Sequence, residues 1–408
     1  MIRHVFTLVW NRKRANALII TEILASFLVL CMVVTTLTYY LLNWRRPLGF
    51  DYDNVLEVST EFVWRGHDAE TRRAILERLR QIETELHGID AVEHVALGQN
   101  VPYSNSISSW QFEGAGRNFE VLWGRVRPEF RDVLHLDLAT GRWLEDGDDK
   151  LSWVPIVINR RLARDLFGIE SPLDMSLPRF EDDGTPRDRK DGEHDYRVVG
   201  VLSDYRRDGE ISQSPYISFA PVDYDDAEEY PARLFMVRVR PGTTSVIEEE
   251  MSTVLHALAP DWEFDFKWLP ERRRDALRSK LLTLIIGGTV AGFLLIMVGM
   301  GLVGVLWQNV TRRTRELGLR RALGATATGV RWQILGELLA LATVAVVLGA
   351  LLFMQAPLLG IASWVSWKVY ALGLVASLAI LYYLVVLCGL YPSWLATRVL
   401  PARALQYE

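Results

Sequence analysis

Two kinds of hydrophobic pattern divide this 408-residue chain. Four long runs are almost entirely apolar, whereas the region between the first and second runs repeats its apolar residues at short periods. A helix needs roughly 20 mostly apolar residues to cross a bilayer. The runs therefore predict four transmembrane helices, at 17–42, 281–307, 332–353 and 369–390.

The region at 43–280 has the periods of an α+β domain. Both of its ends are typical of strand–helix–strand units, with segments at 54–60, 69–86 and 92–97, and at 234–240, 244–258 and 263–268. Two such units can close into one ferredoxin-like sheet. We therefore expect one lobe from residues 50–98 and 231–270, with 99–230 as an inserted lobe.

The inserted lobe is rich in strand and turn patterns. Its expected strands are 118–126, 154–158, 197–203 and 216–220. Residues 180–195 are polar or turn-forming apart from Phe180, which predicts a hairpin tip or loop. Their acidic residues also allow a calcium site, but the D-x-D-x-D-G spacing of calcium loops is missing.

Charge is distributed unevenly along the chain. Residues 43–280 contain 46 acidic and 32 basic side chains, whereas the rest contains 4 acidic and 13 basic ones. Basic residues next to membrane helices favour the cytoplasmic side. We therefore expect both termini and the 308–331 loop in the cytoplasm, and the large domain and the short 354–368 loop outside.

Both ends of the chain have membrane-related patterns. Residues 1–16 form an amphipathic segment, and 391–408 form a short tail after the last helix. The first run is longer than a signal-peptide core, and no small-x-small site follows it, which predicts an uncleaved anchor. The two cysteines, Cys31 and Cys388, lie in predicted membrane helices, so the domain has no disulfide framework.

The sequence lacks common catalytic motifs. It has no G-x-x-x-x-G-K-[ST] phosphate loop, no G-x-S-x-G elbow and no H-E-x-x-H helix. Its seven histidines are scattered, without metal-ligand spacing. We therefore expect a non-catalytic chain that itself binds no cofactor and no metal.

Glycines in the second apolar run form a G-x-x-x-G pattern at Gly288 and Gly292. Small residues at this spacing let membrane helices approach closely. These positions are candidates for helix–helix packing, although glycine is also common in membrane helices.

The 312–326 segment is the strongest candidate site. It is basic and amphipathic, with Glu316 as its one acid, and Gly324 is suited to end a helix. Such a helix is often simply a membrane-surface helix. Its string RTRELGLRRALGAT, however, closely resembles the R-T-x-E-I-G-x-R-x-A-x-G-A signature of ABC transporter permeases of the MacB/FtsX/LolC type. Residues matching that signature are Arg313, Thr314, Glu316, Gly318, Arg320, Ala322, Gly324 and Ala325.

Other stretches support the resemblance. The C-terminal strings YPSWLA at 391–396 and PARALQYE at 401–408 are similar to the ending of that family. Weaker similarities to the MacB-like periplasmic core domain are VRPEFRDVL at 126–134, GRW at 141–143, DLFG at 165–168 and RVVGVLSD at 197–204.

The resemblance implies a fold and a set of partners. The fold is an α-helical membrane protein with four transmembrane helices and a large α+β extracytoplasmic domain between helices 1 and 2. The 308–331 loop is then a coupling helix that docks into an ATPase. Residues implied in that contact are Arg313, Thr314, Arg315, Glu316, Leu317, Gly318, Leu319, Arg320, Ala322, Leu323, Gly324 and Ala325.

The implied assembly contains two ATPase copies and a second permease, identical or homologous. ATP and Mg would be bound by the ATPase partner. A periplasmic adaptor and an outer-membrane channel are further possible partners in a bacterial inner membrane, in contact with lipid and without nucleic acid.

The implied activity is mechanotransmission, in which ATP hydrolysis moves the lobes of the outer domain through long helices. This would drive efflux or extrusion of a periplasmic or outer-leaflet substrate. Two alternatives are an FtsX-like subunit that regulates an extracytoplasmic enzyme, and lipoprotein release of the LolC/LolE type.

Overall fold

The chain forms two compact units in the computed structural model. The outer unit is Asn43–Ser279, and the membrane unit combines Met1–Leu42 with Lys280–Glu408. The residues that the structure describes are 13–62, 69–104, 107–114, 117–180, 186–187, 194–224, 232–312, 326–361 and 365–396.

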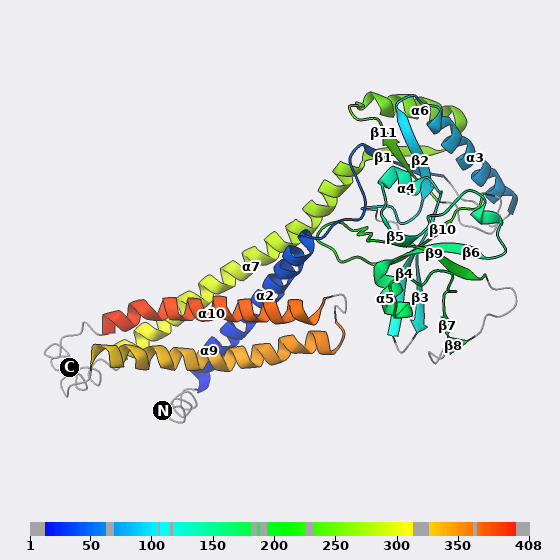
Figure 1. Ribbon diagram of the computed structural model, residues 1–408. Helices are drawn as coiled ribbons and strands as arrows, with labels where there is room; N and C mark the ends of the chain where they lie inside the picture. The colour runs from blue at the N-terminus through cyan, green and yellow to red at the C-terminus, as the bar shows by residue number, and fades with distance from the viewer. Residues whose placement is uncertain are drawn as a thin grey trace. The chain divides into compact units, whose positions relative to one another are not determined.

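The first lobe of the outer unit is the expected pair of strand–helix–strand units. Its sheet has the order β12-β1-β11-β2, and neighbouring strands are antiparallel. Helices α3 and α6 lie together over this sheet (Figure 1). The elements are β1 (Val55–Glu61), α3 (Ala69–His87), β2 (Val92–Gly98), β11 (Leu234–Val239), α6 (Val246–Leu258) and β12 (Glu263–Trp268).

Helix α3 follows from its sequence pattern. Leu79, Ile82 and Leu86 recur at helical spacing, and all are buried against the sheet. Glu70 in the first turn and His87 in the last turn suit the helix dipole. One apolar face and one polar face therefore fix the orientation of α3.

The inserted lobe extends the same sheet. The strand order continues β2-β4-β10-β6-β9-β5, and Gly98 of β2 pairs with Val126 of β4 at the junction. The sequence pattern predicted two lobes, but it did not predict that one sheet runs through both. The elements are β3 (Ser109–Gly114), β4 (Arg117–Val126), α4 (Phe130–Leu134), β5 (Leu138–Gly141), η1 (Asp148–Lys150), β6 (Val154–Asn159), α5 (Arg160–Phe167), β9 (Tyr196–Leu202) and β10 (Tyr216–Pro221).

The polar stretch at 180–195 begins in a hairpin. Strand β7 (Arg179–Phe180) pairs with β8 (Pro186–Arg187) in a separate two-stranded sheet. Residues 181–185 and 188–193 lie outside the described part of the chain. The hairpin agrees with the turn-forming composition of this stretch.

Four helices are long and apolar enough to cross a membrane. They are α2 (Lys13–Trp44), α7 (Leu269–Arg312), α9 (Ala327–Leu358) and α10 (Trp367–Ala396). Helices α9 and α10 lie side by side (Figure 1). Phe27, Val298 and Leu381 belong to the buried core of the membrane unit.

Helix α7 is longer than its apolar run. It starts at Leu269 in the outer unit and ends at Arg312 in the membrane unit. Its 44 residues correspond to about 66 Å at 1.5 Å per residue, well beyond a hydrocarbon core of roughly 30 Å. The polar turns at 271–280 therefore continue the second membrane helix into the outer unit.

Candidate functional site

The predicted coupling residues, from Arg313 to Ala325, lie outside the described part of the chain. The helices on either side are described. Helix α7 ends at Arg312, and α9 begins at Ala327 after Thr326, whose hydroxyl accepts a hydrogen bond from the Gly329 N–H at 3.2 Å. The segment thus connects two membrane-length helices, and the role of its residues stays a prediction.

The two glycines of the G-x-x-x-G pattern have open space at the position that a side chain would occupy. A Cβ added at Gly288 or Gly292 would meet no described atom within 4 Å. A Cβ at Gly373 of α10 would instead lie 2.2 Å from the hydroxyl of Thr35 in α2. Within the described membrane unit, close helix packing therefore uses other glycines, and helix–helix packing at Gly288 and Gly292 stays a prediction.

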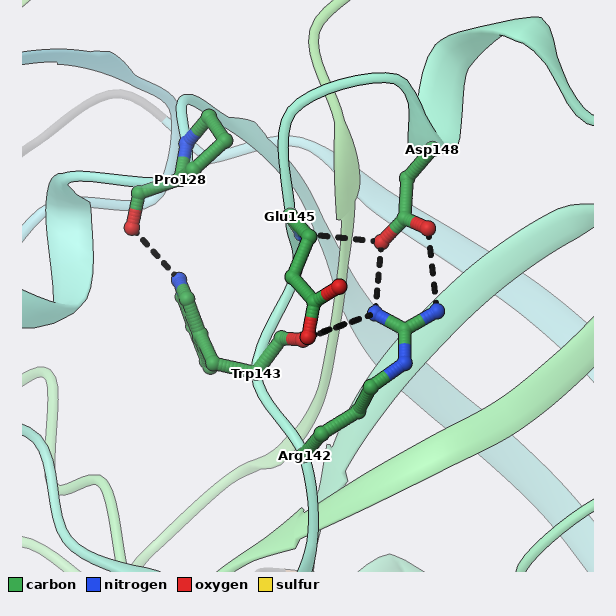
Figure 2. A network of polar contacts seen from close by, with 5 residues as sticks. All are labelled: Pro128, Arg142, Trp143, Glu145 and Asp148. Carbon is green, nitrogen blue, oxygen red and sulfur yellow. Dashed lines mark hydrogen bonds and ion pairs between the residues drawn. The ribbon is translucent and has the colours of Figure 1, made fainter.

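A polar network in the outer unit fixes the loop after β5 (Figure 2). Arg142 makes two hydrogen bonds to the Asp148 carboxylate, at 2.8 and 2.9 Å, and Asp148 also accepts from the Glu145 N–H at 2.9 Å. The indole N–H of Trp143 donates to the Pro128 carbonyl at 2.7 Å. A bidentate pair of this kind orders the loop.

This loop borders a hollow of about 670 Å³. Its lining includes the acidic residues Glu129, Asp132 and Asp146 together with Arg131 and Trp143. The volume lies in the range of small-molecule sites. Among the described residues, no group of three or more His, Cys, Asp or Glu is placed to hold a metal.

A second hollow, of about 570 Å³, lies against β1 of the outer unit. Glu57 in its lining is 2% exposed, and its Oε1 accepts from Arg272 at the start of α7 at 2.6 Å. Burial raises the pKa of Glu57 more than the Arg272 charge lowers it. The pair attaches the first turns of α7 to the sheet.

Glu83 of α3 is the centre of a third polar cluster. The Tyr224 hydroxyl donates to Glu83 Oε2 at 2.9 Å, and Arg127 Nε lies 3.4 Å from the same oxygen. Burial raises the pKa of Glu83 and outweighs the attraction of Arg127. The cluster joins the first lobe to the segment after β4, and its geometry indicates a structural contact.

The sequence patterns missed the last two arrangements, around Glu57 and Glu83. Arg272 and Glu57 are 215 positions apart in the sequence, and Tyr224 and Glu83 are 141 positions apart. No local spacing brings such residues together. The only sequence signal was a charged residue inside an apolar strand or helix face, such as Glu57 in β1.

Two protein-family models match the chain. The MacB-like periplasmic core domain matches residues 16–254, and the FtsX-like permease C-terminal domain matches residues 288–401. The first model covers more than half of the chain.

Several relatives are similar to the chain. The macrolide export ATP-binding/permease protein MacB of Bdellovibrio bacteriovorus is 24% identical over 360 residues, covering 82% of the chain and 50% of that protein. The ABC transporter permease YvrN of Bacillus subtilis is 25% identical, covering 69% of each. YknZ of the same organism is 35% identical over 139 residues, covering 32% of the chain and 33% of YknZ. The chain thus spans half or less of the length of the MacB and YknZ relatives.

Solved structures are also similar to part of the chain. The periplasmic region of MacB from Actinobacillus actinomycetemcomitans gives a TM-score of 0.37 at 16% identity, covering 55% of the chain and 92% of that structure. The extracellular domain of YknZ gives 0.34 at 16% identity, covering 52% of the chain and all of that structure.

Proposed function

The chain belongs to the ABC transporter permeases of the MacB/FtsX type, and from this premise we propose that it converts ATP hydrolysis by a partner ATPase into movement of its outer unit. The movement would extrude a substrate from the periplasm or the outer leaflet. The proposed partners are two ATPase copies and a second permease.

The order of the matched domains carries this proposal, and the continuity of α7 supports it. The two family models match in order along the chain, the periplasmic core domain first and the permease domain after it. Helix α7 runs continuously from the outer unit into the membrane unit. A continuous helix is stiff, so a displacement at one of its ends can be passed to the other.

The 313–325 segment is the proposed contact with the ATPase. It matches the family signature at eight positions, and it joins the end of α7 to the start of α9. Its basic side chains favour the cytoplasmic side, where ATP is available. We therefore assign the coupling role to residues Glu316–Gly324 of this segment rather than to the number of its arginines.

The extrusion of a substrate is a separate part of the proposal. The Bdellovibrio relative is named for macrolide export and for ATP binding. The chain aligns with half of that protein, and its own sequence has no phosphate loop. Extrusion is favoured over enzyme regulation because the core-domain model spans residues 16–254, which include most of the outer unit.

The coupling role can be tested by replacing Glu316 and Leu317 with alanine in the full chain. We expect the variant to insert into the membrane and to lose co-purification with its ATPase, because the charged and apolar contacts of the docking surface are both removed. The readout is the amount of ATPase recovered with the tagged permease.

Arg321→Ala is the matched control, because Arg321 lies in the same basic segment but does not match the signature. We expect it to retain the ATPase. Equal recovery of the ATPase by both variants and by the unchanged chain would contradict the proposed coupling role.

A further inference from the structure

Two neighbouring arginines of the outer unit are completely enclosed. Arg206 is 0% exposed and Arg207 is 1% exposed, and they follow β9 in the loop at 204–212. Burial of a guanidinium is costly unless its N–H groups are hydrogen-bonded. The hydrogen bonds of Arg206 and Arg207 therefore hold other segments of the outer unit in place.

Arg206 holds the segment that enters the outer unit from α2. Its Nη1 donates to the carbonyls of Asn43 and Arg46, at 3.0 and 2.9 Å. Asn43 lies in the last turn of α2, where carbonyls have no partner within the helix. The Asn43 carbonyl accepts from Arg206 in addition to the Arg46 N–H, and a buried cation here suits the negative end of the helix dipole.

The same loop is pressed against the residues that follow. The Arg206 N–H donates to the Leu48 carbonyl at 2.9 Å. Gly49 has φ of +83°, and a Cβ at this position would lie 2.1 Å from the Asp204 carbonyl oxygen. Only glycine fits this contact, so the loop and residues 43–49 form one packed element.

Glu210 joins this element to α7. Its backbone carbonyl accepts a hydrogen bond from Arg206 Nη2, and its carboxylate pairs with Arg273 in the first turns of α7. The Glu210 side chain is 10% exposed, so solvent screens this pair only weakly. Arg206 and Glu210 together thus connect the end of α2 with the start of α7, entirely within the outer unit.

The loop also holds the start of the inserted lobe. The Tyr205 hydroxyl donates to the Asn100 carbonyl at 2.9 Å, and the Tyr103 N–H donates to the Arg207 carbonyl at 2.8 Å. Arg207 additionally donates to the Ser104 carbonyl. Residues 100–104 lead from β2 toward the inserted lobe. A displacement of the 204–212 loop therefore also displaces residues 100–104.

We propose that Arg206, Glu210 and Arg273 form a clamp through which movement of the two helices enters the outer unit. The clamp fixes the outer ends of α2 and α7 to one loop. That loop passes their displacement to residues 100–104 and from there to the inserted lobe. This inference rests on the proposed mechanotransmission and assigns it to particular positioning residues.

The experiment uses the full chain with its ATPase partner in nanodiscs, with Cys31 and Cys388 replaced by alanine. Spin labels at Val246 of α6 and Ile169 after α5, which are 68% and 46% exposed, report the distance between the lobes. We expect ATP to shift this distance in the otherwise unchanged chain. Arg273→Gln and Glu210→Gln should each lose the shift while ATPase binding is retained.

Arg272→Gln is the matched control, because it removes the attachment of α7 to Glu57 in the first-lobe sheet but leaves the contacts of the clamp with the 204–212 loop intact. It should keep the ATP-induced shift. Arg273→Lys should also keep it, because a lysine ammonium can still reach the Glu210 carboxylate. Thermal unfolding of each variant shows that the outer unit is folded.

The possible outcomes separate the two proposals. If the ATP-induced shift survives in Arg273→Gln and Glu210→Gln, the clamp is overturned and mechanotransmission stands. If Arg272→Gln loses the shift to the same extent as these two variants, the clamp is overturned in the same way. A distance that does not respond to ATP in the unchanged chain overturns mechanotransmission, and the clamp with it.

Discussion

At the scale of single residues, the outer unit buries acidic side chains beside arginines from distant segments. Glu83 is 8% exposed, and Arg127 and Tyr224 both contact its Oε2. Burial disfavours the charged carboxylate, so the pKa of Glu83 is raised. The folded chain therefore keeps a proton on Glu83 at pH values where the unfolded chain has lost it.

This raised pKa predicts a pH-dependent contribution to stability. The contribution is fully present below the unfolded pKa of about 4.3 and is lost as pH rises through the folded pKa. The melting temperature of the unchanged chain, relative to Glu83→Gln, should thus rise as pH falls toward that value. Thermal unfolding of the detergent-solubilised chain over a pH series measures this.

The control for the Glu83 prediction is Glu77→Gln, an exposed position on the same helix. Its melting temperature should follow that of the unchanged chain across the series. A constant difference between the unchanged chain and Glu83→Gln at every pH would show that burial does not raise the pKa of Glu83.

At the scale of elements, the membrane helices pack where one helix has no side chain. Gly373 of α10 lies against Thr35 of α2, and Gly389 lies against Leu335 of α9. Close approach of this kind maximises van der Waals contact in lipid, where no hydrophobic effect drives helices together. The G-x-x-x-G pattern at Gly288 and Gly292 is on a different helix, α7, where an added Cβ would meet no neighbouring atom in the described part of the chain.

Gly373→Ala should therefore destabilise the membrane unit, by about 1–3 kcal/mol, because the added methyl group overlaps Thr35. Gly288→Ala should leave the stability of the single chain unchanged. Thermal unfolding in detergent compares the two variants. Similar melting temperatures for both would refute the packing at Gly373.

The oligomeric state of the same two variants tests the other glycine face. If the helix–helix packing predicted at Gly288 takes place on a second permease, Gly288→Ala should weaken association measured by light scattering. Unchanged association of Gly288→Ala would count against that role.

At the scale of the whole molecule, an ABC permease of this type combines a membrane unit with a large extracytoplasmic one. The outer unit, Asn43–Ser279, contains two hollows and several buried ion pairs. The sequence of 408 residues carries no phosphate loop. The energy for any movement is therefore proposed to come from the partner ATPase.

We accordingly expect the purified chain alone to hydrolyse no ATP above background. Addition of the partner ATPase should produce hydrolysis. A partner with a substituted phosphate-loop lysine should not produce it, because that lysine binds the nucleotide phosphates. Phosphate release measures both. Robust hydrolysis by the chain alone, after removal of contaminating ATPases, would refute the division of labour.

Sequence periodicity predicted most individual elements of this protein. The strand patterns at 54–60 and 263–268 correspond to β1 and β12, and the helix pattern at 69–86 corresponds to α3. The four apolar runs became four membrane-length helices. Such elements are readable because a buried face repeats along the chain with the period of the local backbone.

The short helix α4, by contrast, has five residues, too few for a helical period to be recognised. The limits of the next helix, α5, are set by capping. The Asn159 side chain accepts from the Leu162 N–H at 3.1 Å, and Gly168 ends α5 with φ of 73°. These signals are single residues, and other segments of the chain carry them without forming helices.

By itself, the sequence determined the membrane helices, the two strand–helix–strand units and the family signature at 312–326. Only the tertiary structure decided which distant residues meet. It joined both lobes in one sheet at Gly98 and Val126, and it brought Arg206 and Arg273 to the same Glu210. The reason is physical, because a periodic pattern records which face of an element is buried, whereas a buried ion pair depends on the register between segments that fold together from far apart.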